Sequence, residues 1–83
     1  MSEPVTPEHW TADEHSLSRE WPARDFSEAV IFAAAIAQIA NKANHHPDLT
    51  VEYGRVVARI TTHEAGRTLT DKDYDLAERL NSL

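Results

Sequence analysis

Three histidines are the residues of this chain whose types and spacing could do chemistry. His45 and His46 are adjacent and directly precede Pro47, and His63 follows in the segment ITTHEAG. Imidazole titrates near pH ~6.5, so at neutral pH one ring can donate a proton while another accepts one. Rings gathered at one site suit a reaction that needs both an acid and a base, such as the loss of water.

Two other interpretations of the histidines stay open from spacing alone. Three histidines can hold zinc with an open fourth position, but the chain has no HExxH pair and no cysteine. Adjacent residues of a loop also rarely aim both rings at one ion. Solvated histidines without a task are the third interpretation, and they account for His9 and His15, which lie in polar, patternless sequence.

Size and composition limit the classes of protein that the chain can belong to. Its 83 residues form one domain, and the absence of cysteine fits a reducing compartment. The net charge of −6 argues against a nucleic-acid or anionic-membrane partner. No stretch approaches the ~20 apolar residues of a transmembrane helix, and MSEPVTPEHW lacks the features of a signal peptide. We therefore expect a cytoplasmic protein.

The first half of the chain predicts an arm, a strand and a long helix. Residues 1–14 look irregular, because they combine prolines and acids with few apolar groups. The alternation in HSLSREWP predicts a strand over roughly 16–21. Asp25, with Glu28 three residues later, can cap an alanine-rich helix over 27–43.

Apolar residues occupy two sides of that helix. One stripe should pack on a sheet, and it consists of Phe32, Ile36, Ile39 and Ala43. The opposite side carries Ile31, Ala34 and Ala35. An 83-residue chain has no second layer to cover this side, so we expect a subunit interface there.

The second half predicts a loop, a hairpin and a closing helix. Proline disfavours the helical region for His46, so the long helix must end near Asn44 and leave NHHPD as a loop. LTVEYGRVVARITTH then reads as a hairpin with Gly54 and Arg55 at its turn. Thr70 caps the last helix, with Asp73 at the third position. The expected fold class is α+β, an antiparallel sheet of three to four strands with helices packed on one face.

The motifs together resemble those of the pterin-4a-carbinolamine dehydratases, also called 4a-hydroxytetrahydrobiopterin dehydratases. The resemblance rests on NHHPDL, THEAG and LTDKDYDLAERL, with LSREWPARDFSEAVIFAAAIAQIA upstream. The combination of the double histidine and proline, Tyr53 six positions after Pro47, and His63 ten positions later is more specific than any one part. The similarity covers residues 10–83, which we take as a single domain.

The resemblance implies a fold and an activity. Members have a four-stranded antiparallel sheet with helices on one side, and they form homodimers or homotetramers, often through the long helix. The implied activity is that of a hydro-lyase, which removes the hydroxyl from C4a of 4a-hydroxytetrahydrobiopterin to give quinonoid dihydropterin during tetrahydrobiopterin recycling. It uses histidine acid–base catalysis and needs neither a metal nor a cofactor.

The resemblance also implies roles for particular residues. His45 and His63 take the acid and base roles, in an order that it does not fix, and His46 binds and orients the pterin. The substrate-binding residues would be His46, Pro47, Asn41 and Asp48. Asp73 matches a family acid at the start of the last helix, where we expect a capping role rather than a chemical one.

Three departures from the family pattern bear on activity. Asn41 stands where the family usually has an acid, Leu49 where many members have an aromatic residue, and only nine residues precede Trp10 where the family usually has an additional helix. Some relatives of this fold are non-catalytic interaction or assembly modules. That class is therefore the alternative to an enzyme.

Overall fold

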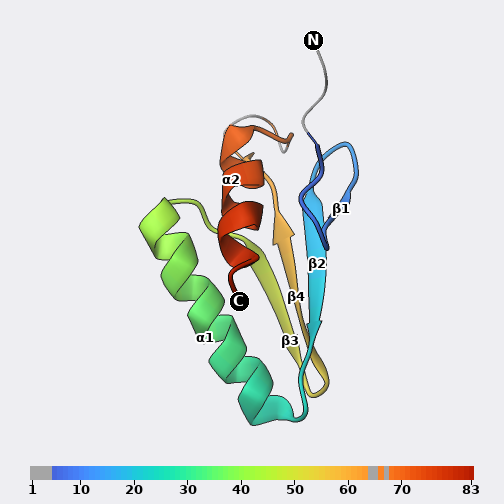
Figure 1. Ribbon diagram of the computed structural model, residues 1–83, viewed down its shortest axis with the longest axis vertical. Helices are drawn as coiled ribbons and strands as arrows, with labels where there is room; N and C mark the ends of the chain where they lie inside the picture. The colour runs from blue at the N-terminus through green and yellow to red at the C-terminus, as the bar shows by residue number, and fades with distance from the viewer. Residues whose placement is uncertain (1–4, 64–65, 67) are drawn as a thin grey trace.

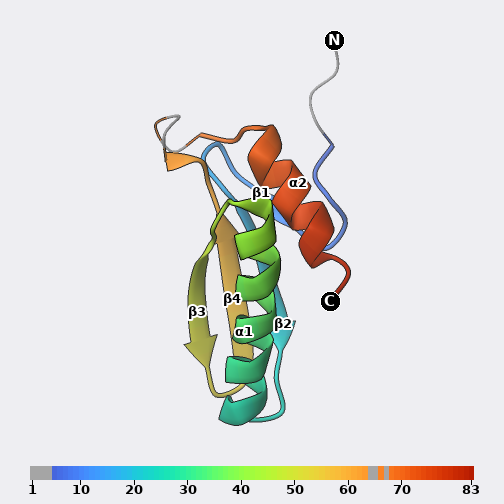
Figure 2. The ribbon, with the colours of Figure 1, turned by 90° about the vertical axis from the view of Figure 1, so that its left-hand side faces the viewer.

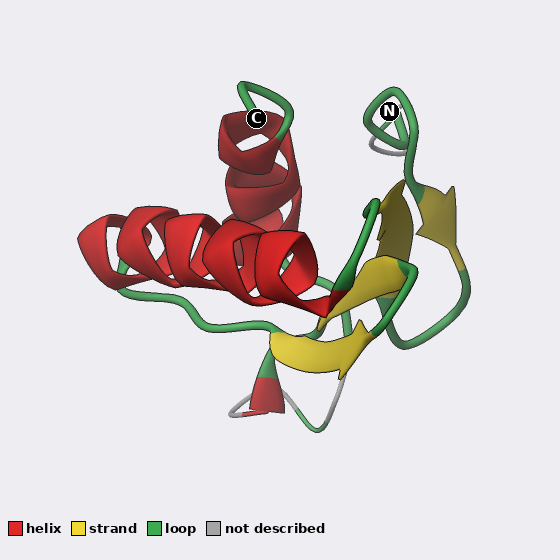
Figure 3. Ribbon diagram, turned by 90° about the horizontal axis from the view of Figure 1, so that it is seen from below, coloured by secondary structure: helices red, strands yellow, loops and turns green. Residues whose placement is uncertain are grey.

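The fold is a four-stranded antiparallel sheet with two helices on one face, which confirms the predicted α+β class (Figures 1 and 3). The computed structural model describes residues 5–63, 66 and 68–83. The strands run β1-β2-β4-β3 across the sheet. The elements in chain order are β1 (Thr11–Ala12), β2 (Leu17–Pro22), α1 (Phe26–Ala43), β3 (Asp48–Glu52), β4 (Arg55–Ile60) and α2 (Asp71–Leu80).

The strand register separates a helix-covered face from an open face. Leu17 lies opposite Ile60 and Trp21 opposite Val56, and all four side chains are buried. Side chains alternate between the faces of a strand, so Arg59 lies on the other face, which no helix covers. The open face therefore carries polar side chains at the end of β4 that leads to His63.

The predicted cap begins α1. The Asp25 carboxylate accepts a hydrogen bond of 2.8 Å from the backbone N–H of Glu28, and this satisfies one of the free N–H groups of the first turn. α1 starts at Phe26, one residue before the predicted start, and packs against β3 and β4 (Figure 2).

The predicted two sides of α1 differ in exposure. Ile36 is fully buried, and the other members of the predicted stripe are partly buried against the core. On the opposite side, Ile31 is 71% exposed, and Phe26 and Val30 are about half exposed. α1 therefore presents an apolar surface that this chain does not cover.

The N-terminal stretch departs from the predicted irregular arm of residues 1–14. Thr11 pairs with Ser18 in the short strand β1, and Trp10 is 7% exposed. The indole Nε1 of Trp10 donates a 2.9 Å hydrogen bond to Oδ1 of Asn81. Residues 1–4 of the stretch lie outside the described residues. The described part is thus attached both to the sheet and to the end of α2.

The bounds of two predicted loops differ from those in the structure. Asp48, assigned to the loop NHHPD, is the first residue of β3, and the hairpin turn consists of Tyr53 and Gly54 rather than Gly54 and Arg55. Arg55 instead begins β4. The predicted loop EAGRT lies partly outside the described residues, at 64–65 and 67. Within the described part of the chain, neither helix is long and apolar enough to span a bilayer.

Candidate active site

The end of α1 places the two adjacent histidines. Asn44 ends the helix with φ of 53°, a left-handed conformation that asparagine tolerates better than most residues. The backbone N–H of His45 still donates to the carbonyl of Ala40, at 3.2 Å. The chain then passes through Pro47 into β3. The helix end and Pro47 therefore fix the backbone positions of His45 and His46.

His45 is held by a buried carboxylate. Its Nε2 atom lies 2.7 Å from Oδ1 of Asp73, and the side chains are 10% and 0% exposed. An ionised carboxylate can only accept hydrogen bonds, so Nε2 carries the proton and Nδ1 is the acceptor of the neutral ring. Nδ1 makes no hydrogen bond to another described residue, so it is available to a substrate.

Asp73 is itself fixed by two hydroxyl-bearing residues. Its Oδ2 atom accepts a hydrogen bond from the backbone N–H of Thr70 and another from the hydroxyl of Thr62, both at 2.7 Å. The first contact is the predicted capping interaction at the start of α2. The carboxylate therefore caps the helix and orients His45 at the same time.

His46 contacts the residue that departs from the family pattern. Its Nε2 atom lies 3.0 Å from Oδ1 of Asn41, in the last turn of α1. The prediction that Asn41 lies beside the histidine loop is therefore confirmed. This contact is exposed, unlike that of His45.

His63 reaches the same place from β4, because the start of β3 and the end of β4 lie at the same end of the sheet. Thr62 bridges to Thr68 just beyond β4, and the backbone N–H of Gly66 donates to the carbonyl of His63 at 3.0 Å. His63 is exposed. It lines a cavity of about 150 Å³, here called the histidine pocket, whose lining residues are Asn44, His45, His46, Thr61 and His63.

The histidine pocket thus gathers the three predicted histidines but not every predicted binding residue. Asn41 does not line the histidine pocket but contacts His46, which does. Pro47 is partly buried in the loop between His46 and β3. Asp48 lines a larger neighbouring pocket. His9 and His15 do not line the histidine pocket. Among the residues that the structure describes, no three His, Cys, Asp or Glu side chains are grouped as a metal site would require.

Sequence reasoning missed the link between Asp73 and His45. The spacing Thr-x-x-Asp predicts the cap, but nothing in it points to a ring 28 positions earlier in the chain. The contact depends on how α2 packs beside the end of α1. Only the tertiary arrangement brings the two residues together.

The fold and the site together define a small α+β protein with a histidine-lined cavity and a buried His–Asp pair. The family model described as pterin 4 alpha carbinolamine dehydratase matches residues 2–83. The chain belongs to this pterin 4 alpha carbinolamine dehydratase family.

Individual relatives agree with this assignment. A candidate pterin-4-alpha-carbinolamine dehydratase of Haloarcula marismortui is 42% identical over 77 residues, which cover 93% of this chain and 83% of the relative. A protein of the same name from Sulfolobus acidocaldarius is 38% identical, over 92% of this chain and 82% of the relative. Both names are provisional assignments of activity to those proteins.

Solved structures show the same fold. A crystal structure named as a transcriptional coactivator/pterin dehydratase from Brucella melitensis superimposes with a TM-score of 0.76 at 30% identity, covering 90% of this chain and 81% of that one. A pterin dehydratase-like protein, identified as a RuBisCO assembly factor in the alpha-carboxysome, superimposes with a TM-score of 0.66 at 12% identity. The match covers 88% of this chain and 83% of that one. The second likeness concerns the fold alone.

Proposed function

We propose that this protein is a 4a-hydroxytetrahydropterin dehydratase that acts by histidine acid–base catalysis. The observation that carries the proposal is the histidine pocket, in which His45, His46 and His63 line one cavity and a buried carboxylate holds His45. Membership of the pterin 4 alpha carbinolamine dehydratase family supports a pterin as the substrate. The reaction would serve tetrahydrobiopterin recycling after aromatic amino-acid hydroxylation in the cytoplasm.

The chemistry needs an acid and a base. The C4a–O bond breaks, and the leaving hydroxide must receive a proton to depart as water. The N5–H proton leaves as its electron pair forms the C4a–N5 double bond, which gives the quinonoid dihydropterin. Two proton transfers by positioned side chains each contribute about 10²–10⁴-fold to such a rate.

The hydrogen bonds of the site favour one order of the acid and base roles. His45 has Nδ1 available as an acceptor, and Asp73 would stabilise the positive charge that develops when this ring takes the N5 proton. We therefore assign the base to His45. His63 is exposed and so exchanges protons readily with solvent, which suits the acid that protonates the leaving hydroxide. His46 binds and orients the ring, aided by Asn41.

A subunit interface is the second part of the proposal. The apolar surface of α1, made of Phe26, Val30 and Ile31, suits packing against a second copy of the helix in a homodimer or homotetramer. The same surface would also suit a non-catalytic assembly role, which is the alternative function. Dehydratase activity distinguishes the enzyme from the assembly module, because a protein that only assembles others does not need the His45–Asp73 pair.

A direct assay tests the proposal. An aromatic amino-acid hydroxylase generates the 4a-hydroxytetrahydropterin in situ, and the absorbance of the quinonoid product is followed with and without the protein. We expect faster dehydration with the wild type and loss of that acceleration with His45→Ala. A wild-type protein that leaves the spontaneous rate unchanged would support the assembly role instead.

A further inference from the structure

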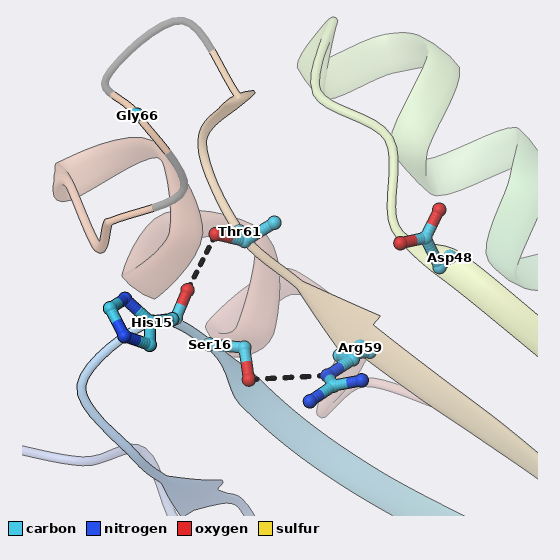
Figure 4. Close-up of a pocket in the computed structure, with 6 residues that line it drawn as sticks. All are labelled: His15, Ser16, Asp48, Arg59, Thr61 and Gly66. Atoms are coloured by element: carbon cyan, nitrogen blue, oxygen red, sulfur yellow. Dashed lines mark hydrogen bonds between the residues drawn. The ribbon is translucent and has the colours of Figure 1, made fainter.

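A second and larger pocket adjoins the histidine pocket on the open face of the sheet. Its volume is about 380 Å³, and its lining residues are His15, Ser16, Asp48, Arg59, Thr61 and Gly66 (Figure 4). We call it the tail pocket. Among the described residues, Thr61 is the one that lines both pockets. Its hydroxyl donates to the carbonyl of His15, so this group is already used within the protein.

Two opposite charges stand in the tail pocket without pairing. Asp48 and Arg59 lie directly opposite each other on β3 and β4, where oppositely charged side chains normally meet. Figure 4 instead shows the guanidinium directed to Ser16, and Arg59 Nε donates to Ser16 Oγ at 3.4 Å. Within the described residues the Asp48 carboxylate has no hydrogen bond or ion pair. The pocket thus offers an unused acceptor and spare donors.

The charge balance indicates what such a pocket can bind. Arg59 and Asp48 cancel formally, and Asp13 lies close enough to Arg59 that the two attract each other. Backbone N–H groups of His15 and Ser16 lower the pKa of Asp13, so it stays ionised at neutral pH. An anionic group in the pocket would therefore meet the Asp48 carboxylate as well as the Arg59 guanidinium, whose charge Asp13 nearby already offsets in part. A neutral group with adjacent hydroxyls can instead accept from Arg59 and donate to Asp48.

The chemistry of the proposed substrate places such a group beside the histidine pocket. C6 of a tetrahydropterin is bonded to N5, the atom whose proton a histidine must take. A side chain on C6 therefore starts next to the reacting atoms. Asn41 lies in the last turn of α1 and contacts His46. A pterin whose pyrimidine half faced these two side chains would direct its C6 substituent toward the sheet.

We propose that the tail pocket binds a hydroxylated C6 side chain of the pterin, with Arg59 and Asp48 as specificity-determining residues. This inference rests on the proposed dehydratase function and adds to it the residues that would recognise the tail of the substrate, a short neutral chain with vicinal hydroxyls. Arg59 donates to one hydroxyl oxygen, and Asp48 accepts from the neighbouring hydroxyl. Neither residue takes part in the proton transfers.

The test compares two substrates that differ only in the tail. The 4a-hydroxy forms of tetrahydrobiopterin, with a dihydroxypropyl tail, and of 6-methyltetrahydropterin are generated in situ, and kcat/KM is measured for each. We expect the wild type to prefer the hydroxylated substrate about tenfold, since hydrogen bonds to charged groups discriminate by at least this much. Arg59→Ala and Asp48→Ala should each remove most of that preference.

A matched control and two contrary outcomes decide the assignment. Arg55 lies on the same strand and the same face but pairs with Glu20 and Glu52, so Arg55→Ala should keep the preference. An equal kcat/KM for both substrates in the wild type would overturn the proposal. So would equal losses on both substrates in Arg59→Ala, because the pyrimidine half would then occupy the pocket.

The preference of the tail pocket for a neutral group over an anionic one is tested separately. Fluorescence titration should show biopterin binding more tightly than 6-carboxypterin, and the reverse order would make the tail pocket an anion site. Turnover of the methyl substrate distinguishes failure of the proposed dehydratase function from failure of the proposed tail pocket. A wild type that dehydrates neither substrate disproves the proposed function, whereas one that dehydrates both without a tail preference disproves the tail pocket alone.

Discussion

Nε2 of His45 lies 2.7 Å from Oδ1 of Asp73, a residue 28 positions later that is fully buried at the first turn of α2. The contact joins the loop after α1 to the N-terminus of α2. It also gives His45 and His63 different surroundings, because His45 is buried against a carboxylate whereas His63 is exposed. The first prediction tests this relationship.

Asp73→Asn should lower the dehydration rate by about 10²-fold or more while the protein stays folded. The amide keeps the size of the side chain but removes the charge, and its NH₂ group can force the wrong tautomer on His45. Asp73→Ala should also destabilise the fold by several kcal/mol, since Thr62 and the Thr70 N–H lose a buried acceptor. Steady-state rates and thermal melts measure both effects.

The control for Asp73 is Asp71→Asn, which alters an exposed acid in the same helical turn. It should leave the rate within about twofold of the wild type. A wild-type rate in Asp73→Asn would mean that the carboxylate is only a cap.

His63→Ala should lower the dehydration rate by about 10²–10⁴-fold, the usual contribution of a positioned acid or base. The ring is exposed, so its loss should leave the melting temperature nearly unchanged. His9→Asn is the matched control, because His9 has φ of 75° and asparagine tolerates this conformation. Equal small effects in the two variants would remove His63 from the mechanism.

Asn41→Glu should raise kcat/KM about tenfold, which corresponds to about 1.4 kcal/mol of transition-state stabilisation. The present amide already contacts His46, and a carboxylate would add a charge that can hold an N–H group of the pterin more strongly. Asn41→Asp adds the same charge on a side chain of the original length. Unchanged kcat/KM in both variants would show that the loop has adapted to the neutral amide.

Ile31→Glu should weaken a dimer or tetramer, because a buried charge without a partner is strongly unfavourable. Sedimentation velocity at micromolar concentration measures the change. Tyr53→Glu is the control, since Tyr53 is as exposed as Ile31, at 70% against 71%, but lies in the hairpin turn. A wild type that sediments as a monomer would leave the apolar surface of α1 to another partner.

Asn81→Ala should lower the free energy of unfolding by about 2 kcal/mol. Its Oδ1 accepts from Trp10 Nε1 and from Arg19 Nη1, and its Nδ2 donates to the carbonyl of Glu8 at 3.0 Å. Truncation leaves the indole and the guanidinium without these partners. Urea denaturation measures the loss, and Ser82→Ala, which alters the next and exposed residue, should cost less.

Local signals made much of the fold predictable. Asp25 and Glu28 mark the start of α1, and Asn44 with the proline after His46 marks its end, because capping and steric rules act within a few residues. The alternation in β2 and β4 likewise predicts which side chains are buried. The strand β1 was missed because two residues, Thr11 and Ala12, carry no periodic pattern.

The site was only partly predictable for the same physical reason. His45 and His46 are placed by their own loop, so sequence reasoning reaches them. The partner of His45 comes from α2, and the pocket around Asp48 comes from strand pairing with Arg59. Such contacts depend on the packing of distant elements, which no local pattern encodes.

The dual use of Asp73 couples local unfolding of α2 to the orientation of the His45 ring. Opening the first turn of α2 would break the cap at Thr70 and withdraw the carboxylate from His45 in the same event. His45, the proposed base, is therefore oriented only while that turn stays closed. A bound pterin that contacts His45 should then slow amide hydrogen exchange across α2, although no residue of this helix lines the histidine pocket.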